Sequence, residues 1–189
     1  MIARLLDVIE NDIVPLTQDG VRAGNKIFGA AILTKSDHAL VVAGTNAETE
    51  NPLWHGEMAT IKNLYELPKD ERPDPAECIF LSTHEPCSMC LSAITWAGYD
   101  NIYYFFAYEQ TRDAFNIPHD LRILKELFGG HYARKNAFWE SHDIVRMTAA
   151  LPSPEKESLE ARVEALTREY GELSDLYQSS KRDNDIPLA

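Results

Sequence analysis

Two short motifs carry the side chains best suited to bind a metal ion. The first is His55-Gly56-Glu57 and the second is Pro86-Cys87-Ser88-Met89-Cys90. Together they offer one imidazole and two thiolates, a set that suits zinc better than magnesium or calcium. A catalytic zinc keeps three protein ligands and leaves a fourth position open for water. We therefore predict a Zn²⁺ ion held by His55, Cys87 and Cys90.

Glu57 supplies a carboxylate beside the predicted metal that is not needed as a ligand. It lies two residues after His55 and can face the same cavity. Zinc lowers the pKa of a bound water toward about 7, so a neighbouring carboxylate can take its proton. A carboxylate in that role needs a partly dry site that raises its own pKa. We predict that Glu57 is the catalytic proton shuttle.

Two other interpretations of the cysteine pair are open. A Cys-x-x-Cys pair also serves in thiol redox chemistry, and a structural zinc needs a fourth protein ligand. Cys78 is one candidate for that ligand, although its apolar surroundings are more typical of a small core residue. His84 also lies nearby in the sequence, and a redox or structural role for it stays open. The joint order and spacing of the two motifs favour the catalytic site.

Composition limits the partners and the compartment. The chain has 189 residues, 44% of them apolar, and a formal net charge of −12. Because phosphate backbones repel such a surface, we expect a small neutral ligand rather than a nucleic acid. Only three cysteines occur, which argues against a disulfide framework and for a reducing compartment. No segment approaches the roughly 18 apolar residues that span a bilayer, and the N-terminus does not resemble a signal peptide. We predict a cytoplasmic protein with no membrane partner.

Hydrophobic periodicity predicts the elements that position the two motifs. Strand and helix patterns alternate, which argues for an α/β fold with a sheet covered on both faces. Each motif falls at the start of a helix, where free backbone N–H groups favour thiolate over thiol. The predicted helices span residues 1–18 (ending near Pro15), 57–67, 89–97 (stopped by Gly98) and 121–128. The predicted strands span residues 26–34, 38–44, 78–82, 102–107 and 137–147.

The C-terminal part of the chain differs from the rest. A Pro-rich break at residues 151–154 separates a domain at 1–150 from an acidic helical extension at 151–189. A helix over residues 155–179 has one apolar stripe, which we expect to dock on the core or on a partner chain. Ser153 is its predicted N-cap, with Pro154 at the first helical position. Residues 180–189 are polar and are expected to fray.

The two motifs resemble those of the cytidine deaminase-like superfamily, for which H-x-E followed by P-C-x-x-C is a known signature. The resemblance runs from Phe28 to Phe128 and is closest to the branch of guanine deaminases, fungal-type cytosine deaminase and tRNA adenosine deaminases. It implies a three-layer α-β-α sandwich around a five-stranded mixed sheet, one zinc per subunit and a homodimer. His-Gly-Glu, in place of the commoner His-Ala-Glu, is similar to fungal-type cytosine deaminase.

The resemblance also implies a reaction and further site residues. The reaction is hydrolytic deamination of a free nucleobase or related heterocycle, in which zinc-bound hydroxide attacks the amine-bearing carbon and ammonia leaves. A guanine-like base is favoured, and the alternatives are a cytosine, a nucleoside, or an isocytosine, pterin or triazine. The net charge disfavours tRNA editing, and a remote alternative is a non-catalytic zinc-stabilised interaction module. Beyond the zinc ligands and Glu57, the implied substrate contacts are Asn46, the backbones of Ala30 and Glu85, stacking by Phe28 or Trp54, and Asp120.

Overall fold

A five-stranded mixed sheet forms the centre of the protein. The computed structural model describes residues 1–189, apart from the side chain of Asp183. The strands are β1 (Gly29–Thr34), β2 (Leu40–Thr45), β3 (Cys78–His84), β4 (Asn101–Phe106) and β5 (Glu140–Asp143), in the spatial order β2-β1-β3-β4-β5. β1 is antiparallel to β2 and β3, whereas β3, β4 and β5 run parallel. The predicted mixed sheet is therefore confirmed.

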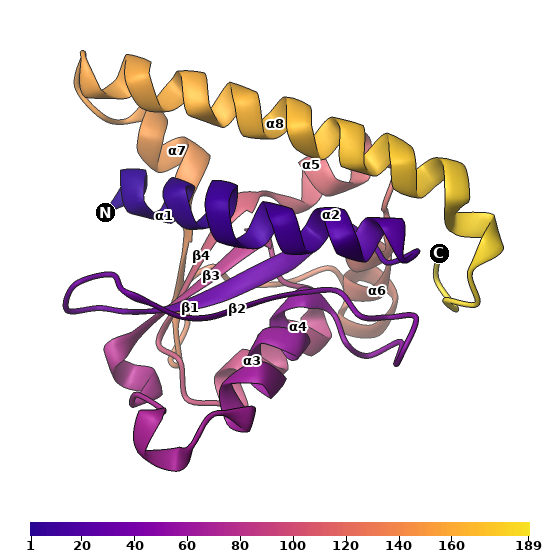
Figure 1. Ribbon diagram of the computed structural model, residues 1–189, viewed down its shortest axis with the longest axis horizontal. Helices are drawn as coiled ribbons and strands as arrows, with labels where there is room; N and C mark the ends of the chain where they lie inside the picture. The colour runs from indigo at the N-terminus through magenta and orange to yellow at the C-terminus, as the bar shows by residue number, and fades with distance from the viewer.

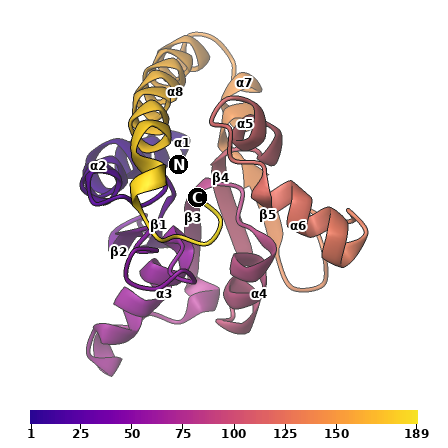
Figure 2. The same cartoon turned by 90° about the vertical axis from the view of Figure 1, so that its right-hand side faces the viewer.

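Helices cover both faces of this sheet, as Figures 1 and 2 show. One face is covered by the N-terminal helices and by the C-terminal helix, and the other by the two helices that carry the metal-binding motifs. The first layer contains α1 (Ile2–Val8), α2 (Val14–Arg22), α7 (Ile144–Ala149) and α8 (Glu155–Ser180), and the second contains α3 (Gly56–Glu66) and α4 (Ser88–Trp96). Two short helices, α5 (Tyr108–Asp113) and α6 (His119–Phe128), follow β4.

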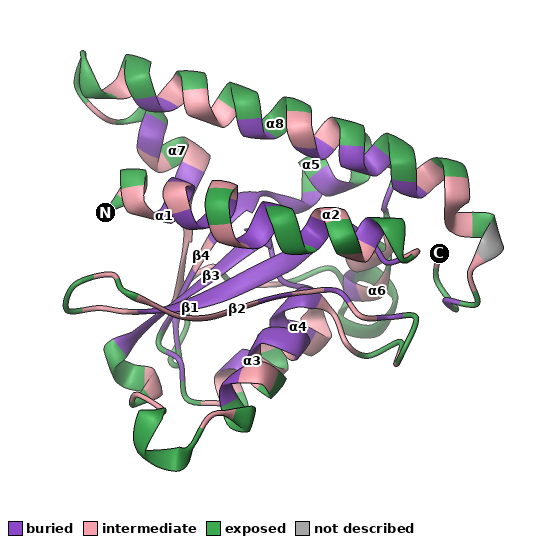
Figure 3. Cartoon of the chain, viewed as in Figure 1, coloured by how far each residue is buried: buried purple, intermediate pink, exposed green. Residues whose placement is uncertain are grey.

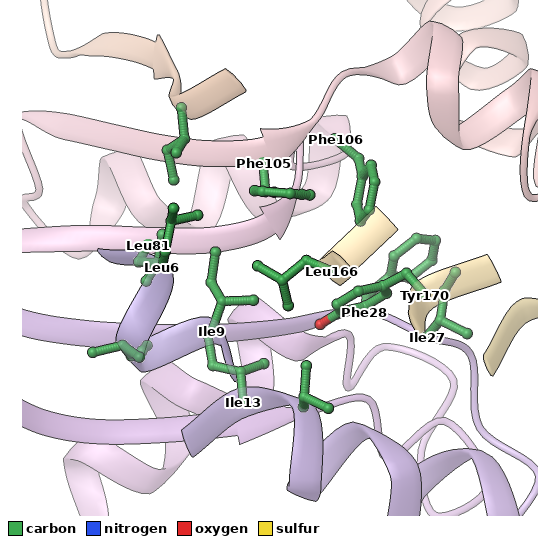
Figure 4. Packing of buried hydrophobic residues seen from close by; sticks show 14 of the residues in the cluster. Leu6, Ile9, Ile13, Ile27, Phe28, Leu81, Phe105, Phe106, Leu166 and Tyr170 are labelled. Carbon is green, nitrogen blue, oxygen red and sulfur yellow. The ribbon is translucent and has the colours of Figure 1, made fainter. Parts of the chain in front are cut away.

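Alternating residues of the strands supply the two hydrophobic cores. In β3, Ile79 and Leu81 pack with α1, α2 and α8, whereas Cys78 and Phe80 pack with α3 and α4. This alternation follows from the two-residue period of a strand, which sends successive side chains to opposite faces. Figure 4 shows the first core, where Tyr170 of α8 lies among the aromatic and aliphatic side chains of the sheet.

The first helix does not end near Pro15, contrary to the prediction. A π-helical turn at Ile9–Ile13 joins α1 to α2, and the helix continues to Arg22. Pro15 lies in the first turn of α2. The π-helical turn lies just before Pro15, whose ring nitrogen has no N–H to donate to the preceding turn. The proline therefore marks a change of helical winding rather than an end.

The last predicted strand is only partly correct. Strand pairing covers Glu140–Asp143, and the chain then enters helix α7, whose N-terminus is capped by Asp143 accepting from the Arg146 N–H at 3.0 Å. The short helix α5 was not predicted at all. Helix α8 begins at Glu155 with Pro154 as its N-cap, so the predicted capping by Ser153 is wrong by one residue.

The C-terminal helix docks on the core rather than projecting away from it. Its buried side chains include Leu166 and Tyr170, and Figure 3 shows the buried stripe facing the sheet. The residues after it are not frayed, because Asn184 donates to the Gly24 carbonyl at 2.8 Å and Ile186 is buried. The division at residue 150 stays a prediction. Among the described residues, no helix is both long and apolar enough to cross a bilayer.

Candidate metal centre and cavity

Three side chains from the two motifs converge at one point. The donor atoms of His55, Cys87 and Cys90 all lie within 4.8 Å of one another. His55 and Cys87 are the N-cap residues of α3 and α4, with extended backbones, and Cys90 lies in the first turn of α4. Spacing by three residues places Cys87 and Cys90 on the same side of that turn. The predicted meeting of the three side chains at two helix starts is therefore observed.

The electrostatics of this cluster favour a cation. A hydrogen bond from the Cys90 thiol lowers the pKa of Cys87, as does the adjacent His55, and together they outweigh the opposing effect of burial. Burial raises the pKa of Cys90, with a further contribution from its bonding to Cys87. Burial alone lowers the pKa of His55, but its hydrogen bond with Cys87 and the negative charges around it raise that pKa to about 9. A divalent cation relieves the repulsion between two thiolates, so the donor set and its surroundings fit zinc.

The candidates for a fourth protein ligand lie elsewhere. Among the side chains that the structure describes, His55, Cys87 and Cys90 form the cluster without a fourth donor. Cys78 is a buried core residue at the beginning of β3. His84 is enclosed by aromatic rings, including those of Phe28 and Tyr170. Three protein donors leave one position for solvent or substrate, which is the arrangement of a catalytic zinc.

Glu57 is buried next to the cluster. Its carboxylate accepts a hydrogen bond from the Ser82 hydroxyl of β3 at 2.9 Å. Burial raises the pKa of Glu57, and the charge of Cys87 raises it further, while His55 opposes both. A carboxylate with a raised pKa exchanges protons more readily near neutral pH than an exposed one. The environment of Glu57 is thus suited to general acid–base catalysis, although Glu57 itself does not line the cavity.

A cavity of about 590 Å³ opens beside the metal-binding side chains. His55 and Cys87 form part of its wall, together with the predicted substrate contacts Phe28 and Asp120. Burial, with the charge of Cys87 as a second cause, raises the pKa of Asp120 to about 8. Apolar side chains from α6 form much of the remaining wall. A mostly apolar cavity with few polar groups is typical of a small-molecule site.

Four predicted substrate contacts do not line this cavity. Asn46 is buried, where it donates to Glu48 at 2.7 Å and accepts from the Gly56 N–H. Ala30 lies inside β1, and its carbonyl accepts from Thr60. Trp54 is half-buried, with the Lys62 ammonium over its ring. The roles of these residues toward a base stay predictions.

Glu85, the fourth of these residues, has its side chain engaged within the protein. Its carboxylate accepts two hydrogen bonds from Arg134, each 2.8 Å long, and a third from the Tyr108 N–H. These bonds link the end of β3 to α5 and to the loop before β5. The side chain therefore stabilises the loop that carries Cys87, and the predicted contact of its backbone with a base remains untested.

Sequence reasoning missed two groups in the cavity wall. The first is the ion pair of Lys26 and Glu48, whose Nζ and Oε1 atoms are 2.7 Å apart. The position of Glu48 two residues after Asn46 was the one available signal for it. The second group is Ile186, Pro187 and Leu188 near the C-terminus. Nothing in the local sequence places that segment beside residues so distant along the chain.

Comparison with known proteins defines the class of this chain. Residues 13–106 match the model of the cytidine and deoxycytidylate deaminase zinc-binding region. The chain is 35% identical over 117 residues to guanine deaminase of Bacillus subtilis, covering 60% of this chain and 71% of that protein. The protein therefore belongs to the cytidine and deoxycytidylate deaminase family, and zinc is the metal of its site.

Two further likenesses add to this assignment. A probable cytosine deaminase of Schizosaccharomyces pombe is 26% identical over 85 residues, which cover 45% of this chain and 50% of that protein. The crystal structure of guanine deaminase from Bacillus subtilis superposes with a TM-score of 0.53 at 24% identity, covering 82% of this chain and 91% of the other. This second likeness shows a shared fold. The predicted fold and family are thus confirmed.

Proposed function

We propose that this protein is a hydrolytic deaminase of a free nucleobase, with a guanine-like purine as the favoured substrate. The observation that carries the proposal is the cluster of His55, Cys87 and Cys90, two of which line the cavity, with Glu57 buried beside it. A zinc ion bound there supplies Lewis acidity, which makes water a nucleophile near neutral pH. A site that only stabilises the fold has no use for an open position or for a buried carboxylate.

In this proposal Glu57 moves the protons of the reaction. It takes a proton from the attacking water and gives it to a ring nitrogen of the base. It then transfers the second proton of that water to the amino group. The carbon–nitrogen bond breaks, ammonia is released, and the ring carbon becomes a carbonyl. Ser82 holds one Glu57 oxygen at 2.9 Å, which keeps the carboxylate in place between the two transfers. Such positioned acid–base groups contribute about 10²–10⁴ in rate.

Asp120 and Phe28 support a purine substrate. Both lie on the cavity wall, where an aromatic ring can stack on a base and a carboxyl group can bond to an exocyclic amino group. The similarity to a protein named guanine deaminase favours guanine among the purines. Cytosine is the second candidate, because the other relative is named a probable cytosine deaminase.

We also propose that the protein acts as a homodimer in the cytoplasm. Trp96 at the end of α4 is 92% exposed, and Phe138 nearby is also exposed. These two side chains line one surface hollow, which a second copy of the chain would cover. Multi-angle light scattering tests this point, and a monomer at all concentrations contradicts it. Two of the three cysteines are the proposed zinc ligands and the third, Cys78, is buried outside any disulfide, which fits a reducing compartment.

A screen for ammonia release tests the proposed activity. Zinc-loaded protein is incubated with guanine, cytosine, isocytosine, adenine, pterins and the matching nucleosides. We expect release from guanine above all, and none from a Cys87→Ala variant, which loses both metal and activity. Release from cytosine alone favours the second candidate. No release from any compound, by protein that contains zinc, contradicts the deaminase function. Full activity of a metallated Cys87→Ala protein contradicts the assignment of Cys87 as a zinc ligand.

A further inference from the structure

A buried pair of opposite charges borders the metal cluster and has no part in the proposed proton transfers. The side chains of Lys26 and Glu48 are 6% and 2% exposed, and their Nζ and Oε1 atoms are 2.7 Å apart. Lys26 precedes β1, and Glu48 lies in the loop between β2 and α3. Burying a charged pair carries a desolvation cost that hydrophobic side chains of similar size avoid. The pair therefore calls for an explanation beyond stability.

Glu48 is linked to the metal-binding motif directly through one oxygen and by way of Asn46 through the other. Oε1 lies 3.6 Å from Nε2 of His55, and Oε2 accepts from the Asn46 amide at 2.7 Å. The oxygen of the same Asn46 amide accepts the N–H of Gly56, the residue after His55. One carboxylate thus faces the His55 ring directly and also restrains the backbone next to it.

The two nitrogens of His55 face different neighbours. Nδ1 lies 3.5 Å from the Cys87 sulfur, on the side of the metal cluster, and Nε2 faces Glu48. A metal ligand must present a lone pair, so its other ring nitrogen must carry the proton. A carboxylate beside Nε2 stabilises the proton there and leaves Nδ1 free to bind the ion. Carboxylates that hold a histidine ligand in this way increase metal affinity in many proteins.

We propose that Glu48 is a positioning residue that orients His55 toward the metal, and that Lys26 compensates the charge of Glu48. This inference rests on the proposed zinc site. Neutral His55 and two thiolates balance the charge of Zn²⁺, and Lys26 balances Glu48, so the Lys26–Glu48 pair adds no net charge beside the metal. Without Lys26, Glu48 would remain a buried carboxylate without a counterion.

A purely structural role for the ion pair makes a different prediction, and two variants separate the alternatives. Glu48→Gln keeps the size of the side chain but removes the charge that faces His55. Lys26→Met breaks the same ion pair and leaves that charge in place. The double variant Lys26→Met/Glu48→Gln removes both charges and serves if Glu48→Gln alone fails to fold. Glu10→Gln is a control that breaks an ion pair with Arg162, far from the metal-binding motifs.

The zinc dissociation constant of each purified protein is measured by competition with a chromophoric chelator, and the fold is checked by circular dichroism. We expect Glu48→Gln and the double variant to bind zinc about 10- to 100-fold more weakly than the parent. We expect Glu10→Gln to bind zinc with the affinity of the parent. We expect Lys26→Met to bind zinc with the same affinity or more tightly. Absorption of bound cobalt(II) gives a second readout, with a changed spectrum only where Glu48 is replaced.

Two results would overturn the inference. One is a folded Glu48→Gln protein, or folded double variant, with the zinc affinity and cobalt spectrum of the parent. The other is an equal loss of affinity in Glu48→Gln and Lys26→Met, which assigns the effect to the ion pair as a structural support. Ammonia release by the parent is measured in parallel. A parent that binds zinc but releases no ammonia contradicts the proposed function and leaves the role of Glu48 testable.

Discussion

Gly56 is the position where the fold and the metal site depend on each other most directly. It lies between His55 and Glu57, at the first residue of α3, and the helix approaches the beginning of β1 there. A Cβ atom on Gly56 would lie 2.7 Å from Gly29 Cα, 2.8 Å from the Phe28 carbonyl oxygen and 2.9 Å from the Gly29 nitrogen. Ordinary contact begins at 3.4 Å. Alanine therefore does not fit at position 56 without a shift of the neighbouring backbone.

The expected cost of Gly56→Ala follows from the atoms that the new methyl group meets. All three are backbone atoms, which cannot rotate away as a side chain would. Overpacking typically costs about 1–3 kcal/mol, against a gain of up to about 1 kcal/mol from the better helix propensity of alanine. We expect a net loss of about 1–2 kcal/mol, which lowers the Tm by about 2–8 °C in a chain of this size. A displaced helix start also moves His55 and Glu57, and an error of about 1 Å in such groups can cost about 100-fold in rate.

Differential scanning calorimetry of the zinc-loaded protein, followed by ammonia release, measures both effects. Gly171→Ala is the matched control, because a Cβ at that position of α8 meets no atom within 4 Å. It should raise the Tm slightly and leave the rate unchanged. If Gly56→Ala melted at or above the parent temperature with full activity, the close approach of α3 to β1 would not constrain the metal site as we argue.

Three further changes test other parts of the site and the core. Glu57→Gln should keep zinc and fold but lose about 10²–10⁴ in the rate of ammonia release; an unchanged rate contradicts the proton shuttle. Removing residues 184–189 takes Ile186 and its neighbours out of the cavity wall. KM should then rise about tenfold, which corresponds to about 1.4 kcal/mol of binding free energy, with a smaller change in kcat. An unchanged KM would show that this segment does not contact substrate. Burial lowers the pKa of His84 to about 3. His84 therefore binds a proton near pH 6.5 in the unfolded chain, but stays neutral at that pH in the folded chain. The contribution of neutral His84 to the free energy of unfolding is therefore complete above about pH 6.5. It decreases by about 1.4 kcal/mol per pH unit as the pH falls from about 6.5 toward about 3. Urea titrations from pH 7 to pH 4.5 should show a shallower loss for His84→Phe than for the parent, and equal slopes would contradict the assignment.

The metal cluster could be predicted from the sequence because its geometry is local. Cys87 and Cys90 share one helical turn, and His55 begins the preceding helix, so residue type and spacing nearly define the site. The sheet was predictable for a similar reason, since β3 and β4 are short apolar runs covered on both faces. Local patterns suffice where neighbours in the sequence are also neighbours in space.

The rest of the site depends on contacts between distant segments. Glu48 meets Lys26 across two loops, and Asn184 reaches Gly24 over 160 positions of the chain. No local sequence pattern indicates such contacts, and the sequence does not distinguish a buried lysine from an exposed one. The errors at Pro15 and in the last strand have other causes. Proline also occurs in the first turn of a helix, and a short segment can match the periodicity of a helix and of a strand equally well.

Anomalous diffraction at the zinc absorption edge, from crystals of the zinc-loaded protein, locates the metal itself. We expect one anomalous peak per chain among His55 Nδ1 and the sulfurs of Cys87 and Cys90, with a fourth ligand that is water or substrate. No zinc peak at this place, or a fourth position filled by another protein side chain, would contradict this expectation.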